Sequence, residues 1–269
     1  MPEPTNDGQP RPIALVTGAS AGIGREMARI LAERGHDLVV VARREERLVE
    51  LKRELAERHG ARTMVIAEDL SHVAAPRRIA DTVRASNLEI DVLVNNAGYA
   101  VKGRFMESDW ATHADFLQVM VTSWLHLTHL FLPSMVRRGR GRVLNVSSLA
   151  SMAPEPPGSL YGPTKCLMTT ASRALRADLL GTGVHCTALC PGFTYTEFHD
   201  VLGVREEMNR LPRSMWLDAR TVCLAGLAGV ERNRPVVLPG LFNKFAAGMC
   251  RILPYAVTYR MIPKSVTDR

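Results

Sequence analysis

A tyrosine and a lysine stand four positions apart in the sequence YGPTK, as Tyr161 and Lys165. Residues four apart on a helix share a face, so a helix through this segment would place the phenol beside the ammonium. A free phenol has a pKa of about 10 and is a poor acid or base at neutral pH, whereas a nearby cation favours the phenolate. The spacing therefore predicts an acid–base tyrosine whose pKa Lys165 lowers. Two surface residues one helical turn apart are the alternative.

Two further residues sharpen this hypothesis. Pro163 lies between the pair, and a helix tolerates proline only in its first turn, so the helix must begin close to Tyr161. Ser148 ends an apolar run thirteen residues before Tyr161. Its hydroxyl would hold a substrate oxygen by a hydrogen bond. The neighbouring Ser147 is interpreted as structural.

A glycine-rich turn, TGASAGIG, occupies residues 17–24. Glycine at positions 18, 22 and 24 lets the backbone turn sharply and approach a ligand without Cβ clashes. The free N–H groups and the positive dipole end of a following helix favour a phosphate at such a turn. Any tight strand–helix connection can use glycine, but this turn follows an apolar run and opens a helical pattern, which is the context that phosphate binding requires.

The elements that must position these groups alternate along the chain. Apolar, β-branched runs that predict strands cover residues 13–18, 37–42, 63–69, 91–98, 141–148, 184–192 and 235–238. Helical patterns lie between them, at residues 24–34, 44–58, 76–86, 109–138, 158–180 and 218–230. Buried strands that alternate with helices predict a parallel sheet covered on both faces. Right-handed crossovers make this an α/β doubly wound Rossmann fold with a mostly seven-stranded sheet.

No linker or repeat interrupts this alternation, which predicts a single domain. Residues 1–11 are polar and proline-rich, without the basic start and apolar core of a signal peptide, and are expected to form a flexible tail. Residues 12–240 are predicted to form the Rossmann domain, with a substrate lid at about 193–217. Residues 241–269 are predicted to form an amphipathic C-terminal extension of the same domain.

Composition argues against several classes of protein. The net charge is +7, but glutamates accompany the arginines of residues 43–58, a pattern typical of a solvated helix face, and no nucleic-acid motif is present. The five cysteines lack the spacing of a metal site, so reduced thiols in a cytoplasmic protein are expected. No run reaches the roughly 18 uninterrupted apolar residues of a membrane-spanning helix.

Four motifs in order give the chain a specific resemblance. They are TGASAGIG (17–24), NNAG (95–98), the serine that ends the fifth predicted strand, and YGPTK (161–165), followed by PGFTYT (191–196). Over residues 12–240 the chain resembles the short-chain dehydrogenase/reductase family. The resemblance implies an NAD(P)-dependent oxidoreductase of carbonyl and alcohol groups that forms a homodimer or homotetramer.

The end of the second predicted strand discriminates between the two nicotinamide cofactors. A carboxylate there would bond the ribose 2′-hydroxyl and repel a 2′-phosphate. The chain has Ala42 followed by Arg43 instead, and a guanidinium pairs with a phosphate through two parallel hydrogen bonds. NADP(H) is therefore predicted over NAD(H). The alternative is that Arg43 and Arg44 are only the charged start of a helix, an interpretation that suits Arg44.

The resemblance also implies the roles of the other site residues. Tyr161 is the acid–base, Ser148 polarises the carbonyl, and Lys165 binds the cofactor ribose. Asp69 and Leu70 border the adenine, although Asp69 could equally cap a short turn. Asn95, Ala97 and Gly98 shape the nicotinamide side of the cleft and steady the sheet. The other residues expected to bind the cofactor are Thr17, Gly18, Ser20, Gly22, Ile23, Gly24, Pro191, Gly192, Thr194 and Thr196.

One position departs from the family pattern. Relatives carry an asparagine about 28 residues before the active serine, where it holds a water that links the lysine to solvent. Counting back from Ser148 gives Met120, whose thioether cannot replace an amide in such a relay. Thr122, Ser123 and His126 are nearby substitutes, but they point to different sides of a helix. The relay is therefore missing, rerouted or supplied by a substrate or partner.

The substrate pocket is expected to be mostly apolar, which favours a lipid-like, acyl, steroid or aromatic carbonyl compound. The facing loop is residues 99–108. The predicted apolar residues of the lid are Phe198, Met208, Met215 and Trp216, although Met and Trp in such a segment are often core residues.

After residue 239, apolar residues recur at roughly helical spacing with Lys244 and Arg251 between them. Three interpretations stay open for this tail: a flap that packs on the lid, a subunit interface, or a basic amphipathic surface for peripheral membrane contact. The rival to the enzyme interpretation is a nucleotide-binding sensor or scaffold with lost turnover. Met120 motivates that rival, whereas the intact Ser148, Tyr161 and Lys165 argue against it.

Overall fold

The computed structural model describes residues 11–101, 103–154, 159–197 and 215–259. Seven parallel strands form one sheet in the order β3-β2-β1-β4-β5-β6-β7. They are β1 (Ile13–Thr17), β2 (Asp37–Ala42), β3 (Thr63–Ala67), β4 (Ile90–Asn95), β5 (Gly141–Val146), β6 (Val184–Leu189) and β7 (Val236–Val237). The prediction of a doubly wound Rossmann fold in a single domain is confirmed. The strand order reverses between β1 and β4, which is where such sheets bind ligands.

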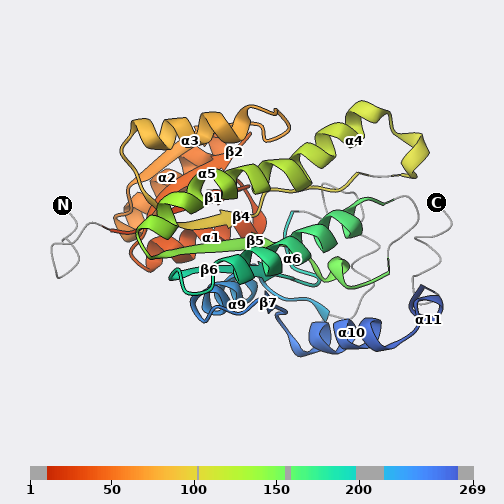
Figure 1. Ribbon diagram of the computed structural model, residues 1–269. Helices are drawn as coiled ribbons and strands as arrows, with labels where there is room; N and C mark the ends of the chain where they lie inside the picture. Colours follow the sequence, from red (N-terminus) through yellow and green to blue (C-terminus); the bar gives the residue numbers. More distant parts are fainter. Residues whose placement is uncertain (1–10, 102, 155–158, 198–214, 260–269) are drawn as a thin grey trace.

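Helices cover both faces of the sheet (Figure 1). One face carries α1 (Gly22–Glu33), α2 (Glu45–His59) and α9 (Ala219–Glu231). Their buried side chains form one hydrophobic core with the strand side chains that point to this face. The other face carries α3 (Ala75–Ala85), α5 (Trp124–Arg137) and α6 (Tyr161–Asp178). The five inner strands are almost wholly buried between these layers, which explains their continuous apolar sequences, whereas the edge strands β3 and β7 are only partly buried.

The long predicted helix at 109–138 is interrupted in its middle. It consists of α4 (Trp110–Leu117), a π-helical segment at Gln118–Ser123, and α5. A π-helical segment inserts one extra residue into the helical turn and often marks a functional site. By length and composition the whole stretch Trp110–Arg137 could also cross a membrane, but core helices pass the same test. Here Leu127, Phe131 and Met135 pack into the core of the sheet.

The predicted C-terminal extension folds as α10 (Leu241–Ile252) and α11 (Tyr255–Tyr259). In Figure 1 α10 lies beside β7 and α9, at the end of the molecule from which α6 starts. The predicted tail at 1–11 lies outside the described residues except for Arg11. The same holds for most of the predicted lid, including Phe198 and Met208.

Candidate active site

The glycine turn joins β1 to α1 in the geometry that the sequence predicts. Gly18 and Gly22 have φ angles of +66° and +54°, which favour glycine over all other residues. Space is also restricted, because a Cβ at Gly18 would lie 2.7 Å from Nδ2 of Asn96. A Cβ at Gly24 would clash with the carbonyl oxygen of Gly18. The turn is therefore built for close approach of backbone groups.

Asn96 holds this turn against β4. Its Nδ2 donates to the carbonyl oxygens of Thr17 (2.9 Å) and Gly18 (3.3 Å). In return, the Thr17 hydroxyl oxygen accepts the backbone N–H groups of Asn96 (3.0 Å) and Ala97 (3.1 Å). The sequence interpretation missed Asn96 and selected its neighbours in the NNAG motif. The second asparagine of the motif is the feature of the sequence that could have indicated this role.

The Asn95 side chain points into the core of the protein and not into the cleft. Its Nδ2 donates to Thr128 Oγ1 (3.0 Å) and to Asn145 Oδ1 (2.8 Å), and the residue is buried. These bonds join β4 to β5 and α5, which agrees with the expected role of steadying the sheet. They give its side chain no contact with the cleft, because adjacent residues of a strand face opposite sides.

Arg43 and Arg44 follow β2 and take different partners. Arg43 is exposed, and its Nη1 lies 3.7 Å from Asp69 Oδ2. Arg44 Nη2 donates to the Ser20 hydroxyl (3.1 Å) inside the glycine turn. Arg44 is therefore more than the charged first residue of a helix, because its guanidinium reaches the glycine turn.

Asp69 caps a short turn after β3. Its Oδ1 accepts the Ser71 backbone N–H (2.9 Å), and its carbonyl accepts that of His72 (3.1 Å). The Leu70 carbonyl accepts the Ser123 hydroxyl (2.7 Å), which ties this turn to the π-helical segment. The capping alternative for Asp69 therefore applies, and its carboxylate also lies beside Arg43.

Ser148, Tyr161 and Lys165 converge, as predicted. Tyr161 is the first residue of α6, so Pro163 lies in the first helical turn. The Ser148 side chain is close enough to the Tyr161 hydroxyl to lower the pKa of the phenol by hydrogen bonding. Nζ of Lys165 lies 5.7 Å from the centre of the Tyr161 ring and donates to the Val146 carbonyl (2.7 Å). The Ser147 hydroxyl donates to the Lys165 carbonyl (2.8 Å), which confirms its structural interpretation.

The expected lowering of the tyrosine pKa is not present in the protein alone. Burial raises the pKa of Tyr161 to about 12, with the Ser148 hydrogen bond acting in the opposite direction. Burial also lowers the pKa of Lys165 to about 8. The physical reason is that the Lys165 ammonium lies over the ring and donates to a carbonyl, so it stabilises the phenolate little. Burial then raises the pKa of the phenol and lowers the pKa of the ammonium, because it disfavours both charged forms.

Met120 occupies the place that the sequence indicates. A Cβ built on Gly98 would lie 3.0 Å from Sδ of Met120 and 3.7 Å from Nζ of Lys165. The carbonyl of Met120 accepts the indole N–H of Trp124 (3.0 Å). Ser123 is no substitute for the relay, because its hydroxyl donates to Leu70. The Met120 thioether and the Lys165 ammonium therefore both lie next to Gly98.

The loop after β6 returns to the glycine turn. A Cβ at Gly22 would lie 3.1 Å from Cβ of Thr196. Thr194 is buried, and its hydroxyl donates to the Gly192 carbonyl (3.1 Å). The Pro191 carbonyl accepts the Leu149 N–H (2.7 Å), which joins this loop to the segment after Ser148. The loop thus runs from the segment after Ser148, which Pro191 contacts, to the glycine turn, which Thr196 contacts.

Trp216 belongs to the base of the predicted lid. It is buried, stacks on Tyr195 at a centroid distance of 4.8 Å and packs against Phe193 at 5.5 Å. Backbone bonds between Tyr195 and Leu217 and between Leu217 and Phe193 hold the two ends of the segment together. These contacts agree with the alternative that Trp216 is a packing residue, and its place in the pocket lining stays a prediction.

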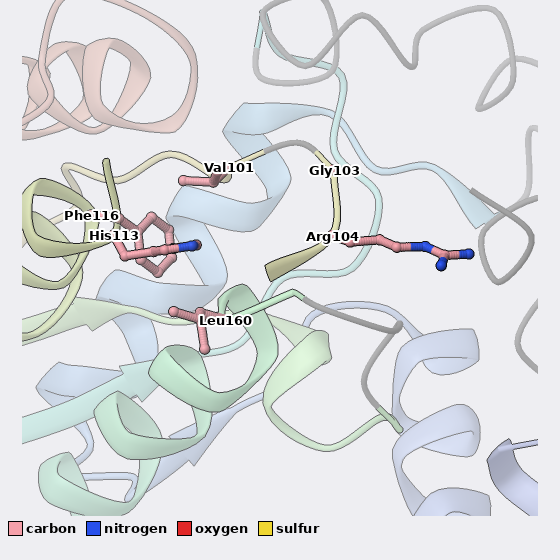
Figure 2. Close-up of a pocket in the computed structure, with 6 residues that line it drawn as sticks. All are labelled: Val101, Gly103, Arg104, His113, Phe116 and Leu160. Atoms are coloured by element: carbon pink, nitrogen blue, oxygen red, sulfur yellow. The ribbon is translucent and has the colours of Figure 1, made fainter. Parts of the chain in front are cut away.

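A pocket lies beside the start of α6. The residues that line it are Val101, Gly103, Arg104, His113, Phe116 and Leu160. Leu160 directly precedes Tyr161, and the others come from the loop after β4 and from α4 (Figure 2). His113 Nε2 lies 2.8 Å from the Phe105 carbonyl, and its ring stacks on Phe105. In Figure 2 the Arg104 side chain extends away from His113 and Phe116. The pocket wall is mixed, since the apolar Val101, Phe116 and Leu160 share it with Gly103, Arg104 and His113.

Comparison with known proteins agrees with this geometry. The family model for short chain dehydrogenase matches residues 12–206. The chain belongs to this family. It is 36% identical over 191 residues to sulfoacetaldehyde reductase 2 of Chromohalobacter salexigens, which covers 69% of this chain and 74% of that protein. It is 37% identical over 195 residues to the NADP-dependent 3-hydroxy acid dehydrogenase of Escherichia coli K12, covering 70% and 75% of the two chains.

Solved structures give the same result. The short-chain dehydrogenase of Sphingobium yanoikuyae in complex with NADPH superposes with a TM-score of 0.79 at 30% identity, over 90% of this chain and 96% of that one. The bulky-bulky ketone specific alcohol dehydrogenase of Comamonas testosteroni gives a TM-score of 0.75 at 28% identity, over 94% and 99%. The chain is therefore an oxidoreductase of the short-chain dehydrogenase type, which acts on CH–OH and C=O groups.

Proposed function

We propose that this enzyme transfers a hydride between NADP(H) and a carbonyl or secondary alcohol of a mostly apolar small molecule. The observation that carries the proposal is the convergence of Ser148, Tyr161 and Lys165. Gly98 lies close to Nζ of Lys165. Asn96 connects this segment to the glycine turn. A carbonyl group bound there would meet a hydrogen-bond donor and an acid–base group together.

The residues present fit NADP(H). The glycines of the turn have positive φ angles or no room for a Cβ atom, so only backbone groups line this turn, where a phosphate could approach them. Arg44 and Ser20 would hold the 2′-phosphate with Arg43 on its exposed side, because two guanidiniums neutralise a dianion better than one. When bound, the nicotinamide supplies or accepts the hydride. The relatives described as NADP-dependent or bound to NADPH support this cofactor.

Each catalytic side chain has a separate task in this proposal. Tyr161 gives its hydroxyl proton to the carbonyl oxygen during reduction and takes it back during oxidation. Ser148 donates a hydrogen bond to the same oxygen as negative charge develops on it. Lys165 would bind the ribose hydroxyls. Together with the positive charge of the oxidised nicotinamide, its ammonium would favour the phenolate and lower the pKa of Tyr161.

The substrate class rests on the pocket wall. Val101, Phe116 and Leu160 offer hydrocarbon surface in the pocket, and Leu160 directly precedes Tyr161. Such surface favours an apolar compound by desolvation. The alcohol dehydrogenase named for bulky-bulky ketones supports this class. Small acids are the rival class, because two relatives are named for sulfoacetaldehyde and 3-hydroxy acids.

The test is NADPH oxidation across a panel of carbonyl compounds that includes bulky aryl ketones, long-chain aldehydes and small keto acids. Tyr161→Phe should lower kcat by about a thousandfold, since a positioned acid–base contributes roughly 10²–10⁴. NADPH affinity should stay within about threefold, because the change removes one hydroxyl and no charge. Turnover that survives Tyr161→Phe would overturn the catalytic assignment, and activity confined to keto acids would overturn the substrate class.

A second candidate function is a nucleotide-responsive sensor with little turnover. The observation that favours it is the Met120 thioether beside Lys165, where a polar relay would refill the proton used by Tyr161. Tight NADPH binding without any turnover that depends on Tyr161 would select the sensor. A homodimer or homotetramer in the cytoplasm is proposed for either function, and the molar mass in solution tests the assembly.

A further inference from the structure

Helix α10 has its apolar stripe on the side that faces away from the protein. Leu241, Phe245 and Ile252 are 83%, 67% and 84% exposed. At 3.6 residues per turn these three lie within about 40° around the helix axis. The residues buried against the rest of the chain, Asn243 and Ala247, lie on the opposite side. Hydrocarbon exposed in a continuous stripe is unfavourable in water and indicates a partner.

The charges of this segment indicate which kind of partner. Lys244 and Arg251 lie on one flank of the stripe, and neither forms an ion pair with another described residue. From residue 232 to residue 267 the sequence has six Lys or Arg and no Asp or Glu. An apolar stripe with a cationic flank complements the acyl boundary and the anionic headgroups of a membrane.

A second copy of the chain fits this surface less well. In a two-fold dimer the same patch meets itself, so Lys244 and Arg251 would face their own counterparts. A stable dimer also buries about 800 Å² on each partner, which exceeds what one narrow stripe supplies. The like charges that oppose self-association attract an anionic surface.

We propose that α10 docks the enzyme on an anionic lipid bilayer, with Leu241, Phe245 and Ile252 inserted into the interface and Lys244 and Arg251 among the headgroups. Helix α10 contacts the loop of Gly192 through Asn243. Asn243 donates to the Pro239 carbonyl (2.7 Å), and a Cβ at Gly192 would lie 2.6 Å from Cγ of Asn243. The loop of Pro191 and Gly192 would thus stay near the membrane and meet apolar substrates there, a consequence that rests on the proposed function, whereas the docking itself does not.

The test is co-sedimentation of the full chain with vesicles, which needs no catalysis. Vesicles of phosphatidylcholine with about one-third phosphatidylglycerol should bind the protein, and pure phosphatidylcholine should bind it at least several-fold less. The double variant Leu241→Glu/Phe245→Glu should lower binding to the anionic vesicles by at least about tenfold, because two large side chains leave the apolar phase. The double variant Lys244→Gln/Arg251→Gln should lower it by roughly tenfold or more and weaken its salt dependence.

Leu180→Glu is the matched control. Leu180 is also exposed, at 59%, but lies in the turn that precedes β6, at the amino ends of the strands, whereas α10 follows the carboxyl end of β7. It should leave binding unchanged, and all variants should keep the wild-type melting temperature. If the double glutamate variant does not fold, Ile252→Glu alone serves the same purpose.

Three results would overturn the proposal. They are absence of binding to the anionic vesicles at low salt, binding that the glutamate variants leave unchanged, and a dimer that Leu241→Glu/Phe245→Glu dissociates without any vesicle. The last result would assign the stripe to a second copy of the chain. Loss of NADPH oxidation with vesicle binding intact would concern the proposed function alone.

Discussion

Two regions with different polar character meet at Gly98. On one side, four hydrogen bonds from Asn96 and Ala97 to Thr17 and Gly18 fix the glycine turn against the end of β4. On the other side, Lys165 is 4% exposed and has the Met120 thioether as a neighbour, where an amide would be expected. The glycine turn, which would bind the cofactor, is therefore held by hydrogen-bonded polar groups. Lys165, which would supply protons to Tyr161, is buried away from water. The comparison indicates that cofactor geometry is preorganised, whereas proton supply is the weak part of the site.

On the polar side, the largest effect is expected at the residues that would hold the 2′-phosphate. Arg44→Ala should raise the KM for NADPH by about tenfold to a hundredfold, since a charge-assisted bond contributes roughly 1.5–3 kcal/mol. The KM for NADH should change little, because NADH lacks the 2′-phosphate. Arg43→Ala is the matched change at the guanidinium that lies beside Asp69 instead of Ser20, and it should have the smaller effect. Equal effects of the two variants would remove the distinction between Arg43 and Arg44.

The desolvated side predicts a pH dependence. Burial lowers the pKa of Lys165 to about 8, so this lysine loses its charge as the pH rises through that value. Tyr161 stays protonated, because its pKa is raised to about 12. The kcat/KM for reduction should therefore fall about tenfold per pH unit above pH 8.

Lys165→Arg provides the control, because a guanidinium keeps its charge throughout this range. The alkaline limb should disappear from the kcat/KM profile of this variant, or from its NADPH dissociation constant if turnover is too slow to measure. A wild-type profile that stays flat to about pH 9.5 would contradict the assignment.

Adjacent asparagines allow a direct comparison of the core with the turn. Asn96→Ala leaves the Thr17 and Gly18 carbonyls without their donor, which should lower the free energy of unfolding by about 1–3 kcal/mol and weaken NADPH binding. Asn95→Ala removes two bonds in the core and should lower stability by a similar amount without changing NADPH affinity. Denaturant unfolding and NADPH titration measure the two effects. An unchanged affinity in Asn96→Ala would separate this residue from the cofactor site.

The smallest effect is expected at Met120. Met120→Asn restores an amide beside Lys165 and should raise the turnover number by a few fold if proton exchange limits it. The solvent isotope effect on kcat should fall at the same time. Unchanged turnover with an unchanged isotope effect would show that the relay does not limit this enzyme. Met120→Leu keeps the apolar volume and should behave as the wild type does.

Helices α1 and α10 show how far sequence patterns reach. Both are amphipathic, but α1 buries its apolar residues Met27, Ile30 and Leu31 in the core, whereas α10 exposes Leu241 and Phe245. Periodicity locates a stripe on a helix and cannot say whether the stripe faces the protein or solvent, because that depends on what packs beside it. Three interpretations of the C-terminal segment were therefore compatible with the sequence.

The strands, the helices, the glycine turn and the pairing of Tyr161 with Lys165 are all determined by local information. Spacing, apolar periodicity, Pro163 and positive-φ glycines act within a few residues, so one sequence suffices to predict them. Contacts between distant segments required the tertiary structure: Asn96 on the glycine turn, Arg44 on Ser20, and Met120 beside Lys165. The raised pKa of Tyr161 has the same origin, because desolvation depends on every layer of the fold around the phenol.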